Sequence, residues 1–310
     1  MRFPWDKYEP YNVNRRPTLQ IYITNKCNLQ CKGCFAIRAM NETDDAYMSM
    51  SEYKLAIAET RSKGARQINI LGGEPLLHRQ INQMCNHNFD KGLKTTIYTN
   101  GLYLGQYVPK DFHGAKIRVS VDCLSDGDKP FESLRRPVSA YLRLNGEVDI
   151  NFMIGGNTTL SELKRVADEA EGIGCKTFFI SSYRYLDNNA DFFKNEMDLI
   201  TSGSMNVIDY KELVHAFLWR YTGNMEIHIS KRGVFESVIN DIVSGNCSNR
   251  KCNFANYFIG GKIIQCPYDV VNLKYAKDYE FGQRYCQHNS TCLMSKIIVQ
   301  KIKVKRRTDG

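Results

Sequence analysis

Three cysteines stand close together near the start of the chain, at a spacing that suits a metal centre. Cys27, Cys31 and Cys34 are separated by three and then two residues. A structural zinc site is the simpler alternative, but it uses four ligands in a closed tetrahedron, and no further Cys or His stands nearby in the sequence. Three thiolates on a four-iron cluster leave one iron open to a small molecule. The spacing therefore favours an open iron–sulfur cluster.

A second group of cysteines occurs between residues 247 and 292. A turn-rich segment carries Cys247, Cys252 and Cys266, and Cys286 and Cys292 return later in the chain. A hairpin with three cysteines and one later cysteine can enclose a second metal centre with four thiolates. The spacing does not separate Cys286 from Cys292 as the fourth ligand. A structural site of the zinc-ribbon kind is the alternative.

The composition is that of a globular protein. The 310 residues are 43% hydrophobic and 24% charged, close to the averages for soluble domains. Structural disulfides are rare in the cytoplasm, so eleven cysteines point first to metal binding or catalysis. Cys85 and Cys175 stand alone, and we expect them to be core thiols. The sequence has no signal peptide and no membrane-spanning apolar run, which predicts a cytoplasmic protein without membrane contact.

The formal net charge of +9 favours acidic partners. Residues 295–308 contain six Lys or Arg and no acid. This segment could bind the phosphates of a nucleotide or nucleic acid. The more common alternative is a solvated edge strand whose lysines prevent mispairing. Nucleic acid is therefore a possible partner, but the charge alone does not favour it.

Short β-rich runs alternate with helical stretches over the first two thirds of the chain. Six strands are predicted, at residues 19–24, 67–71, 95–98, 116–121, 148–154 and 177–181. Helices between them have capping boxes at Ser49-x-x-Glu52 and Thr159-x-x-Glu162. This order predicts an α/β fold of parallel strands and crossover helices, either an open sheet or a curved partial barrel. In both, ligands bind beyond the carboxyl ends of the strands.

The pattern changes after about residue 200. A helix is predicted at residues 209–222, a strand at 225–229, a helix at 234–243 and a strand at 297–305. We therefore expect two domains. Residues 1–200 would form the α/β core, and residues 201–310 would form bridging helices and the cysteine-rich part.

The cysteine loop after the first strand resembles the hallmark of the radical S-adenosylmethionine (SAM) superfamily, and the resemblance covers residues 18–182. It implies a partial (β/α)6 barrel. It also implies that Cys27, Cys31 and Cys34 hold a [4Fe–4S] cluster whose open iron chelates SAM. Reductive cleavage of SAM would give methionine and a 5′-deoxyadenosyl radical, which abstracts hydrogen from a C–H bond.

The other strand ends agree with this resemblance. Gly72-Gly73-Glu74-Pro75 matches the family's GGEP motif, in which the glycines permit close backbone approach and Glu74 can accept a hydrogen bond from the SAM ammonium. Asp122 is expected to be catalytic, through a hydrogen bond to a ribose or substrate hydroxyl. The SAM-binding residues implied by the resemblance are Phe35, Gly72, Gly73, Glu74, Asn100, Ser120 and Asp122.

The C-terminal cysteines resemble the auxiliary-cluster extensions called SPASM and twitch domains. The full SPASM form holds two auxiliary clusters and needs more cysteines than the five present here. The resemblance therefore implies the shortened form, with one auxiliary [4Fe–4S] cluster. The step from Cys252 to Gly261 is one residue shorter than is usual in such hairpins.

These features predict an enzyme that abstracts hydrogen from a small molecule or peptide. Its auxiliary cluster would accept an electron or bind substrate, and a reducing partner such as flavodoxin or ferredoxin would supply electrons. Only about seventeen residues precede the first strand, which is short for a peptide-leader-binding domain and weakens the case for a peptide. Modification of a nucleotide or nucleic acid is the alternative reaction. An iron–sulfur regulatory or scaffold protein is the alternative of another class, but Glu74, Asn100 and Ser120 argue against it because a scaffold needs no SAM pocket.

Overall fold

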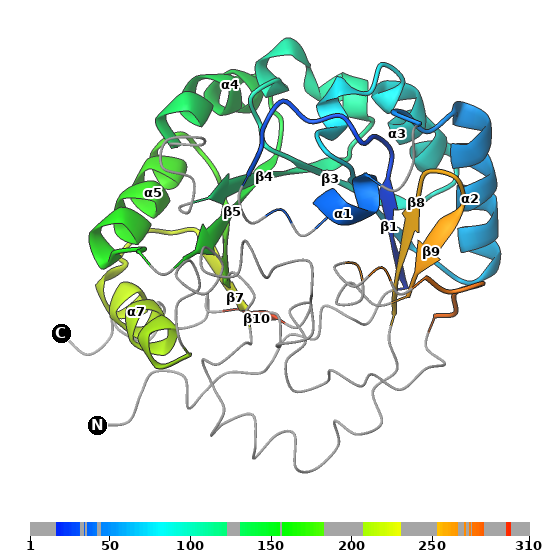
Figure 1. Cartoon of the computed structure of the whole chain (residues 1–310). Helices are drawn as coiled ribbons and strands as arrows, with labels where there is room; N and C mark the ends of the chain where they lie inside the picture. The colour runs from blue at the N-terminus through cyan, green and yellow to red at the C-terminus, as the bar shows by residue number, and fades with distance from the viewer. Residues whose placement is uncertain are drawn as a thin grey trace.

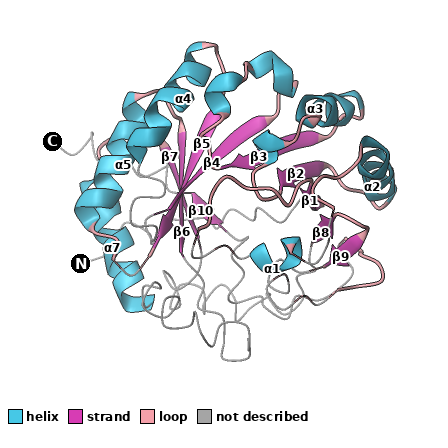
Figure 2. Cartoon of the chain, turned by 45° about the horizontal axis from the view of Figure 1, so that its top comes forward, coloured by secondary structure: helices cyan, strands magenta, loops and turns pink. Residues whose placement is uncertain are grey.

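A computed structural model describes residues 17–31, 34, 36–41, 45–122, 131–155, 157–182, 207–230, 253–265, 270, 273, 275–281 and 296–298. These residues form one curved ten-stranded sheet with helices along its convex side (Figure 1). Figure 2 shows the strands fanning out inside an arc of helices. The predicted α/β fold is confirmed, and of the two expected forms it is the curved partial barrel.

The six predicted strands are present, with bounds within one or two residues of those expected. They are β1 (Thr18–Tyr22), β2 (Gln67–Leu71), β3 (Lys94–Thr99), β4 (Lys116–Asp122), β5 (Val148–Ile154) and β6 (Thr177–Ser182). Each is parallel to the next along the chain. Alternate residues such as Ile68 and Ile70 are buried in the main core, which packs under the helices. All six carboxyl ends therefore meet at one rim of the barrel.

Helices cover the convex face of the sheet. They are α2 (Met50–Ser62), α3 (Ile81–Asp90), α4 (Phe131–Arg143), α5 (Leu160–Gly172) and α7 (Val207–Arg220). The short helix α1 (Ile37–Met40) lies instead on the concave side (Figures 1 and 2). Three 3-10 turns complete the described helical elements, η3 (Pro75–Leu77), η4 (Leu104–Gln106) and η5 (Pro109–Phe112). Within the described residues, no helix is long and apolar enough to cross a membrane.

The two predicted helix starts are confirmed, with one difference in the partners. Ser49 Oγ accepts a hydrogen bond from Glu52 N at 3.1 Å, and Thr159 Oγ1 accepts one from Glu162 N at 3.2 Å. The Glu52 carboxylate, however, accepts from Gly260 N at 2.9 Å instead of from the start of its own helix. This carboxylate therefore joins α2 to the C-terminal part of the chain.

Four later strands extend the same sheet. They are β7 (Glu226–Ser230), β8 (Phe254–Phe258), β9 (Lys262–Ile264) and β10 (Lys296–Ile298). β7 lies parallel to β6, and β8 lies parallel to β1 at the other end of the sheet. β8 and β9 form an antiparallel hairpin whose turn has Gly260 and Gly261 at positive φ, a conformation that glycine adopts at little cost. The helix predicted at 234–243 lies outside the described residues, and the division into domains at 200 stays a prediction.

A second, smaller apolar cluster packs α1 against the edge of the sheet. It joins α1 to β1 and to the β8–β9 hairpin, and Cys34 packs against it. Its buried members are Tyr22, Ala36, Ala39, Met40, Phe258, Ile264 and Val270. We call it the edge cluster. One of the three predicted iron ligands, Cys34, therefore packs against side chains contributed by β1, α1 and the β8–β9 hairpin.

Candidate functional site

The chain leaves β1 into the segment that carries the first three cysteines, residues 24–34, which we call the cysteine loop. Its entrance is held by residues 45–48. Asn25 N donates to Ala46 O at 3.0 Å, and Met48 N donates to Ile23 O at 2.8 Å. The position of the loop is therefore fixed by a second segment before the first cysteine is reached.

None of the three loop cysteines takes part in a disulfide. Cys27 is exposed, and Cys31 and Cys34 are half-buried. Cys34 N donates to Cys31 O at 3.2 Å, which closes a tight turn between the last two, and Leu29 N donates to Cys27 Sγ at 3.4 Å. Three accessible thiols on one short loop suit an iron–sulfur cluster, in which each thiolate binds a different iron.

The two glycines after β2 lie against the cysteine loop. Gly73 N donates to Thr24 O at 2.7 Å, and Glu74 N donates to Lys26 O at 2.8 Å. A Cβ added at Gly73 would lie 2.4 Å from Lys26 O and 2.9 Å from Cys27 Cβ, and one added at Gly72 would lie 2.6 Å from Thr24 O. The glycines are therefore needed because the backbone of the loop occupies the space of any side chain.

The Glu74 carboxylate is fully buried, with 0% exposure. One of its oxygens accepts from Leu76 N at 3.0 Å and from Thr99 Oγ1 at 2.6 Å, and the other accepts from Asn100 N at 2.7 Å. It thus ties the end of β2 to the end of β3. The predicted contact between Glu74 and the SAM ammonium stays a prediction, since these contacts give the carboxylate a second role inside the protein.

Asn100 connects the end of β3 to the cysteine loop. Its amide Nδ2 donates to Asn28 Oδ1 at 2.8 Å, and its Oδ1 accepts from Leu102 N at 3.0 Å. Asn28 follows Cys27 directly, yet nothing in the spacing of the cysteines marked it as important. The structure therefore adds Asn28 to the residues that position the loop.

Of the remaining predicted SAM-binding residues, the structure describes Ser120 fully and Asp122 only in its backbone. Ser120 is half-buried on β4 opposite Asn151 of β5, whose Oδ1 accepts from Ser181 Oγ at 2.9 Å. Asp122 ends β4 and pairs with Met153. The side chain of Asp122 and the whole of Phe35 lie outside the described part of the chain. Their roles stay predictions.

Tyr22, the last residue of β1, lies on the concave side at the base of the cysteine loop. Its side chain is 1% exposed and stacks on Phe258, with ring centroids 4.1 Å apart. Its hydroxyl oxygen is buried and has no hydrogen-bond partner among the described residues. Burial, and to a lesser extent the nearby thiolate of Cys34, raise the pKa of Tyr22 well above its usual range. The Tyr22 hydroxyl is therefore protonated, and it belongs to the cluster of side chains against which Cys34, a predicted iron ligand, packs.

These observations fit a [4Fe–4S] cluster on Cys27, Cys31 and Cys34. The three cysteines form no disulfide, the loop is held by backbone hydrogen bonds on both sides, and the buried Tyr22 hydroxyl lies in the cluster of side chains against which Cys34 packs. No three Cys, His, Asp or Glu side chains of the described residues converge on the position of a single metal ion. A four-iron cluster does not require such convergence, because its thiolates bind separate irons around a cube.

The expected core thiols are confirmed. Cys85 on α3 is 1% exposed and Cys175 before β6 is 4% exposed. Burial raises the pKa of each thiol to about 12, so both are protonated and unreactive near neutral pH. In burial and protonation, Cys85 and Cys175 therefore differ from the more accessible cysteines of the loop.

The five C-terminal cysteines Cys247, Cys252, Cys266, Cys286 and Cys292 lie outside the described residues. The hairpin expected between Cys252 and Cys266 is present as β8 and β9, with Gly261 in its turn. The auxiliary-cluster ligands stay a prediction.

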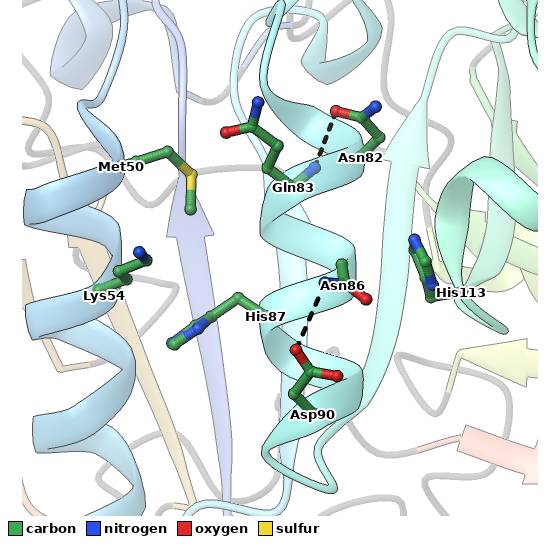
Figure 3. Close-up of a pocket in the computed structure, with 8 residues that line it drawn as sticks. All are labelled: Met50, Lys54, Asn82, Gln83, Asn86, His87, Asp90 and His113. Carbon is green, nitrogen blue, oxygen red and sulfur yellow. Dashed lines mark hydrogen bonds between the residues drawn. The ribbon is translucent and has the colours of Figure 1, made fainter.

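Two cavities of the described residues lie away from this rim, along the groove between α2 and α3. One of about 420 Å³ includes Met50, Asn86 and Asp90 in its lining, and Figure 3 shows His87 and Lys54 pointing toward each other between the two helices. The other, of about 680 Å³, is also lined by His87 and Lys54. Neither contains a predicted site residue.

Comparison with known proteins gives a consistent family. The family model described as Radical SAM superfamily matches residues 21–180, which is half of the chain. A probable GTP 3′,8-cyclase of Methanocaldococcus jannaschii is 37% identical over 112 residues, 35% of this chain and 37% of that protein. An S-adenosylmethionine-dependent nucleotide dehydratase of Selenomonas ruminantium is 37% identical over 92 residues, 29% of this chain and 30% of that protein. The chain therefore aligns with only about a third of each relative.

Among solved structures, Streptococcus suis SuiB matches with a TM-score of 0.64. The match covers 89% of this chain and 67% of that chain at 15% identity, which supports a common fold and nothing finer.

Proposed function

The chain belongs to the radical SAM superfamily, and we propose that it uses SAM to abstract hydrogen from a nucleotide substrate. When bound, a reduced [4Fe–4S] cluster supplies the electron that cleaves SAM to methionine and a 5′-deoxyadenosyl radical. Cys27, Cys31 and Cys34 would hold this cluster. The observation that carries the proposal is the cysteine loop, which carries three cysteines outside any disulfide. Backbone hydrogen bonds hold the loop against the end of β2, and the bond from Asn100 to Asn28 holds it against the end of β3.

The residues of the rim have distinct tasks in this proposal. Gly72 and Gly73 let the GGEP segment approach the loop, and Asn100 fixes the loop through Asn28. Ser120 and Asp122 at the end of β4 would bind hydroxyl groups of the SAM ribose or of the substrate. Strand ends at one rim of a barrel bring such groups together around one ligand.

A nucleotide is the preferred substrate class because of the relatives. Two proteins with 37% identity are named for reactions of GTP or of nucleotides. The net charge of +9 also suits a phosphorylated substrate. One SuiB structure contains a precursor peptide, but its 14% identity supports the fold alone and gives a peptide substrate no comparable support.

We further propose an auxiliary [4Fe–4S] cluster on Cys247, Cys252 and Cys266 with Cys286 or Cys292. The support is the hairpin β8–β9, which lies between Cys252 and Cys266 in the sequence, where the resemblance to SPASM and twitch domains predicts a hairpin. A reducing partner such as flavodoxin or ferredoxin would deliver electrons.

The substrate proposal is tested by adding candidate substrates to anaerobically reconstituted, dithionite-reduced protein with SAM. Nucleoside triphosphates and diphosphates form one set, and unmodified peptides form the control set. We expect at least one nucleotide to accelerate 5′-deoxyadenosine formation and to be converted to a product of changed mass. Acceleration by peptides with no response to any nucleotide would refute the nucleotide class, while leaving SAM cleavage itself intact.

A further inference from the structure

Tyr22 is a buried donor without a described acceptor. Other buried or half-buried tyrosines have partners: Tyr53 Oη accepts from Asn88 Nδ2 at 2.7 Å, Tyr279 Oη lies 2.7 Å from Thr60 Oγ1, and Tyr107 Oη donates to Leu76 O at 2.7 Å. A buried hydroxyl without a hydrogen bond costs free energy, so such a group calls for an explanation. Tyr22 belongs to the edge cluster, against which Cys34 packs.

We propose that the Tyr22 hydroxyl donates a hydrogen bond to the sulfur of Cys34, or to an adjacent sulfide, of the bound [4Fe–4S] cluster. The inference rests on the proposed function, because only a bound cluster would place its sulfide, or the Cys34 sulfur as an iron ligand, to accept this bond. Hydrogen bonds to cluster sulfurs are among the factors that set the reduction potential. Stabilising the more negative, reduced form raises that potential, so Tyr22 is a positioning and tuning residue and not a catalytic one.

The packing around Tyr22 leaves its ring little freedom to turn away. The ring stacks nearly parallel to Phe258, at an interplanar angle of 18°. The ring is 1% exposed and is enclosed by residues of α1 and of the β8–β9 hairpin. The edge cluster therefore presents the hydroxyl as a preorganised donor, which loses little entropy when the cluster binds.

The test is an EPR-monitored redox titration of Tyr22→Phe, following the signal that SAM perturbs. At a fixed applied potential we expect the ratio of reduced to oxidised cluster to fall about threefold or more, with iron content unchanged. Tyr53→Phe is the control, because Tyr53 is also a buried tyrosine but lies on α2, away from the cysteine loop. It should leave the ratio unchanged.

An unchanged ratio in Tyr22→Phe with full iron would overturn the hydrogen bond but not the cluster. Protein that binds no iron at all would instead refute the proposed function. If Tyr22→Phe does not fold, 3-fluorotyrosine at position 22 decides, because its more acidic hydroxyl is a stronger hydrogen-bond donor. A raised reduction potential of the cluster supports the hydrogen bond, and an unchanged potential overturns it.

A second, independent feature is the groove between α2 and α3. Its larger cavity, of about 680 Å³, is lined by four cations, Lys54, Arg61, Arg66 and Lys91, and by no acid. None of the four forms an ion pair with a residue that the structure describes. On α5, by contrast, Arg165 pairs with Glu169 at 3.0 Å and with Glu132, and Lys164 pairs with Asp168. We call this larger cavity the basic groove.

His87 also lines the basic groove, beside Lys54 (Figure 3), so its pKa responds to the charges of the groove. Burial lowers the pKa of His87, and Lys91 and Lys54 lower it further. Asp90 opposes them, and Arg61 adds the smallest lowering effect. Asp90 lines only the smaller neighbouring cavity, where it accepts from Asn86 Nδ2 at 3.3 Å. The positive charges of the basic groove are therefore largely uncompensated.

We infer that the basic groove binds an oligophosphate, such as the phosphate chain of a small nucleotide, outside the barrel. Several cations around a cavity of this size suit a compact multivalent anion, and cavities of a few hundred Å³ hold small ligands. The groove lies on the convex side, so this ligand is separate from any substrate at the rim.

The probe is inorganic tripolyphosphate, measured by calorimetry on the full chain. In Lys54→Gln/Arg61→Gln we expect the affinity to fall about tenfold or more, and in Lys164→Gln/Arg165→Gln, which removes the same charge from α5, to change little. Binding should also raise the pKa of His87 in NMR titrations. Equal losses in both double variants, no saturable binding, or binding of a single-stranded oligonucleotide without binding of tripolyphosphate would each overturn this inference.

Discussion

Glu74 is a motif residue whose described contacts are all with other residues of the protein, at the ends of β2 and β3. Its carboxylate has 0% exposure and accepts three hydrogen bonds, from Leu76, Thr99 and Asn100. The sequence identified Glu74 through the GGEP pattern, but the partners could not be predicted because Thr99 and Asn100 are 25 and 26 residues away. The same limit explains why Asn28 and the Tyr22 hydroxyl were not singled out.

We predict that Glu74→Gln lowers the thermal stability of SAM-free protein. The amide NH2 group would face one of the donors that the carboxylate now accepts, and a buried donor left unpaired costs about 1–3 kcal/mol. The measurement is Tm in the absence of SAM, with Glu162→Gln on α5 as the control. A variant as stable as the wild type that nevertheless loses SAM binding would favour direct contact with the SAM ammonium over this buried role.

His78 is predicted to make stability depend on pH below neutrality. Its Nδ1 accepts from Gln80 N at 3.1 Å, so Nε2 is the protonated nitrogen that donates to Met48 O at 2.9 Å in the neutral ring. Burial lowers the pKa of His78. The unfolded state therefore binds a proton first as the pH falls below about 6.5, and stability is lost until the folded pKa is reached.

The measurement is the free energy of unfolding as a function of pH, from about pH 5 to about pH 8, the range in which histidine titrates. The slope at acidic pH should be smaller in His78→Gln than in the wild type. Identical slopes would mean that His78 does not contribute.

At the scale of elements, local patterns predicted the strands well and their distant partners poorly. The strands β1 to β6 follow from apolar alternation and turn signals, which are local. A hairpin was expected between Cys252 and Cys266, but the pairing of its strand β8 with β1 was not, because it joins Thr18 to Phe254, which lies far away in the sequence. Likewise Ser49 and Glu52 marked the start of α2, yet the Glu52 carboxylate binds the turn of the β8–β9 hairpin.

The contact between the GGEP segment and the cysteine loop gives an element-scale prediction. In Gly73→Ala the new methyl group would lie 2.4 Å from Lys26 O, a backbone atom that can move only if the loop moves. We expect iron content after anaerobic reconstitution to fall strongly. Gly172→Ala is the control, because a Cβ there meets nothing within 4 Å. Full iron in Gly73→Ala would show that the loop tolerates this displacement.

At the scale of the whole molecule, the cysteine loop and Asn253, the described residue next to Cys252 in sequence, lie at opposite ends of β1. The cysteine loop follows its carboxyl end, whereas Thr18 N at its amino end donates to Asn253 O at 2.8 Å, next to Cys252 in sequence. The length of β1 separates these positions by about 16 Å. This separation favours electron transfer or substrate binding at a distance from SAM as the role of an auxiliary cluster.

We predict about eight irons per chain after anaerobic reconstitution, because two separate sets of cysteines are present. Changing Cys27, Cys31 and Cys34 together to Ala should remove about half of the iron. Changing Cys85 and Cys175 to Ala should remove none, since both thiols are buried in the core. Wild-type protein that binds no more than about four irons per chain would contradict the proposed auxiliary cluster.

The central claim is that the cluster of the cysteine loop cleaves SAM, and quantifying 5′-deoxyadenosine from dithionite-reduced protein tests it most directly. Slow cleavage is expected even without substrate, because the electron donor and SAM are both present. The wild type should form 5′-deoxyadenosine and methionine, and the Cys27→Ala/Cys31→Ala/Cys34→Ala protein should form neither while keeping its remaining iron. Wild-type protein with a full iron complement that leaves SAM intact, or a triple variant as active as the wild type, would contradict the claim.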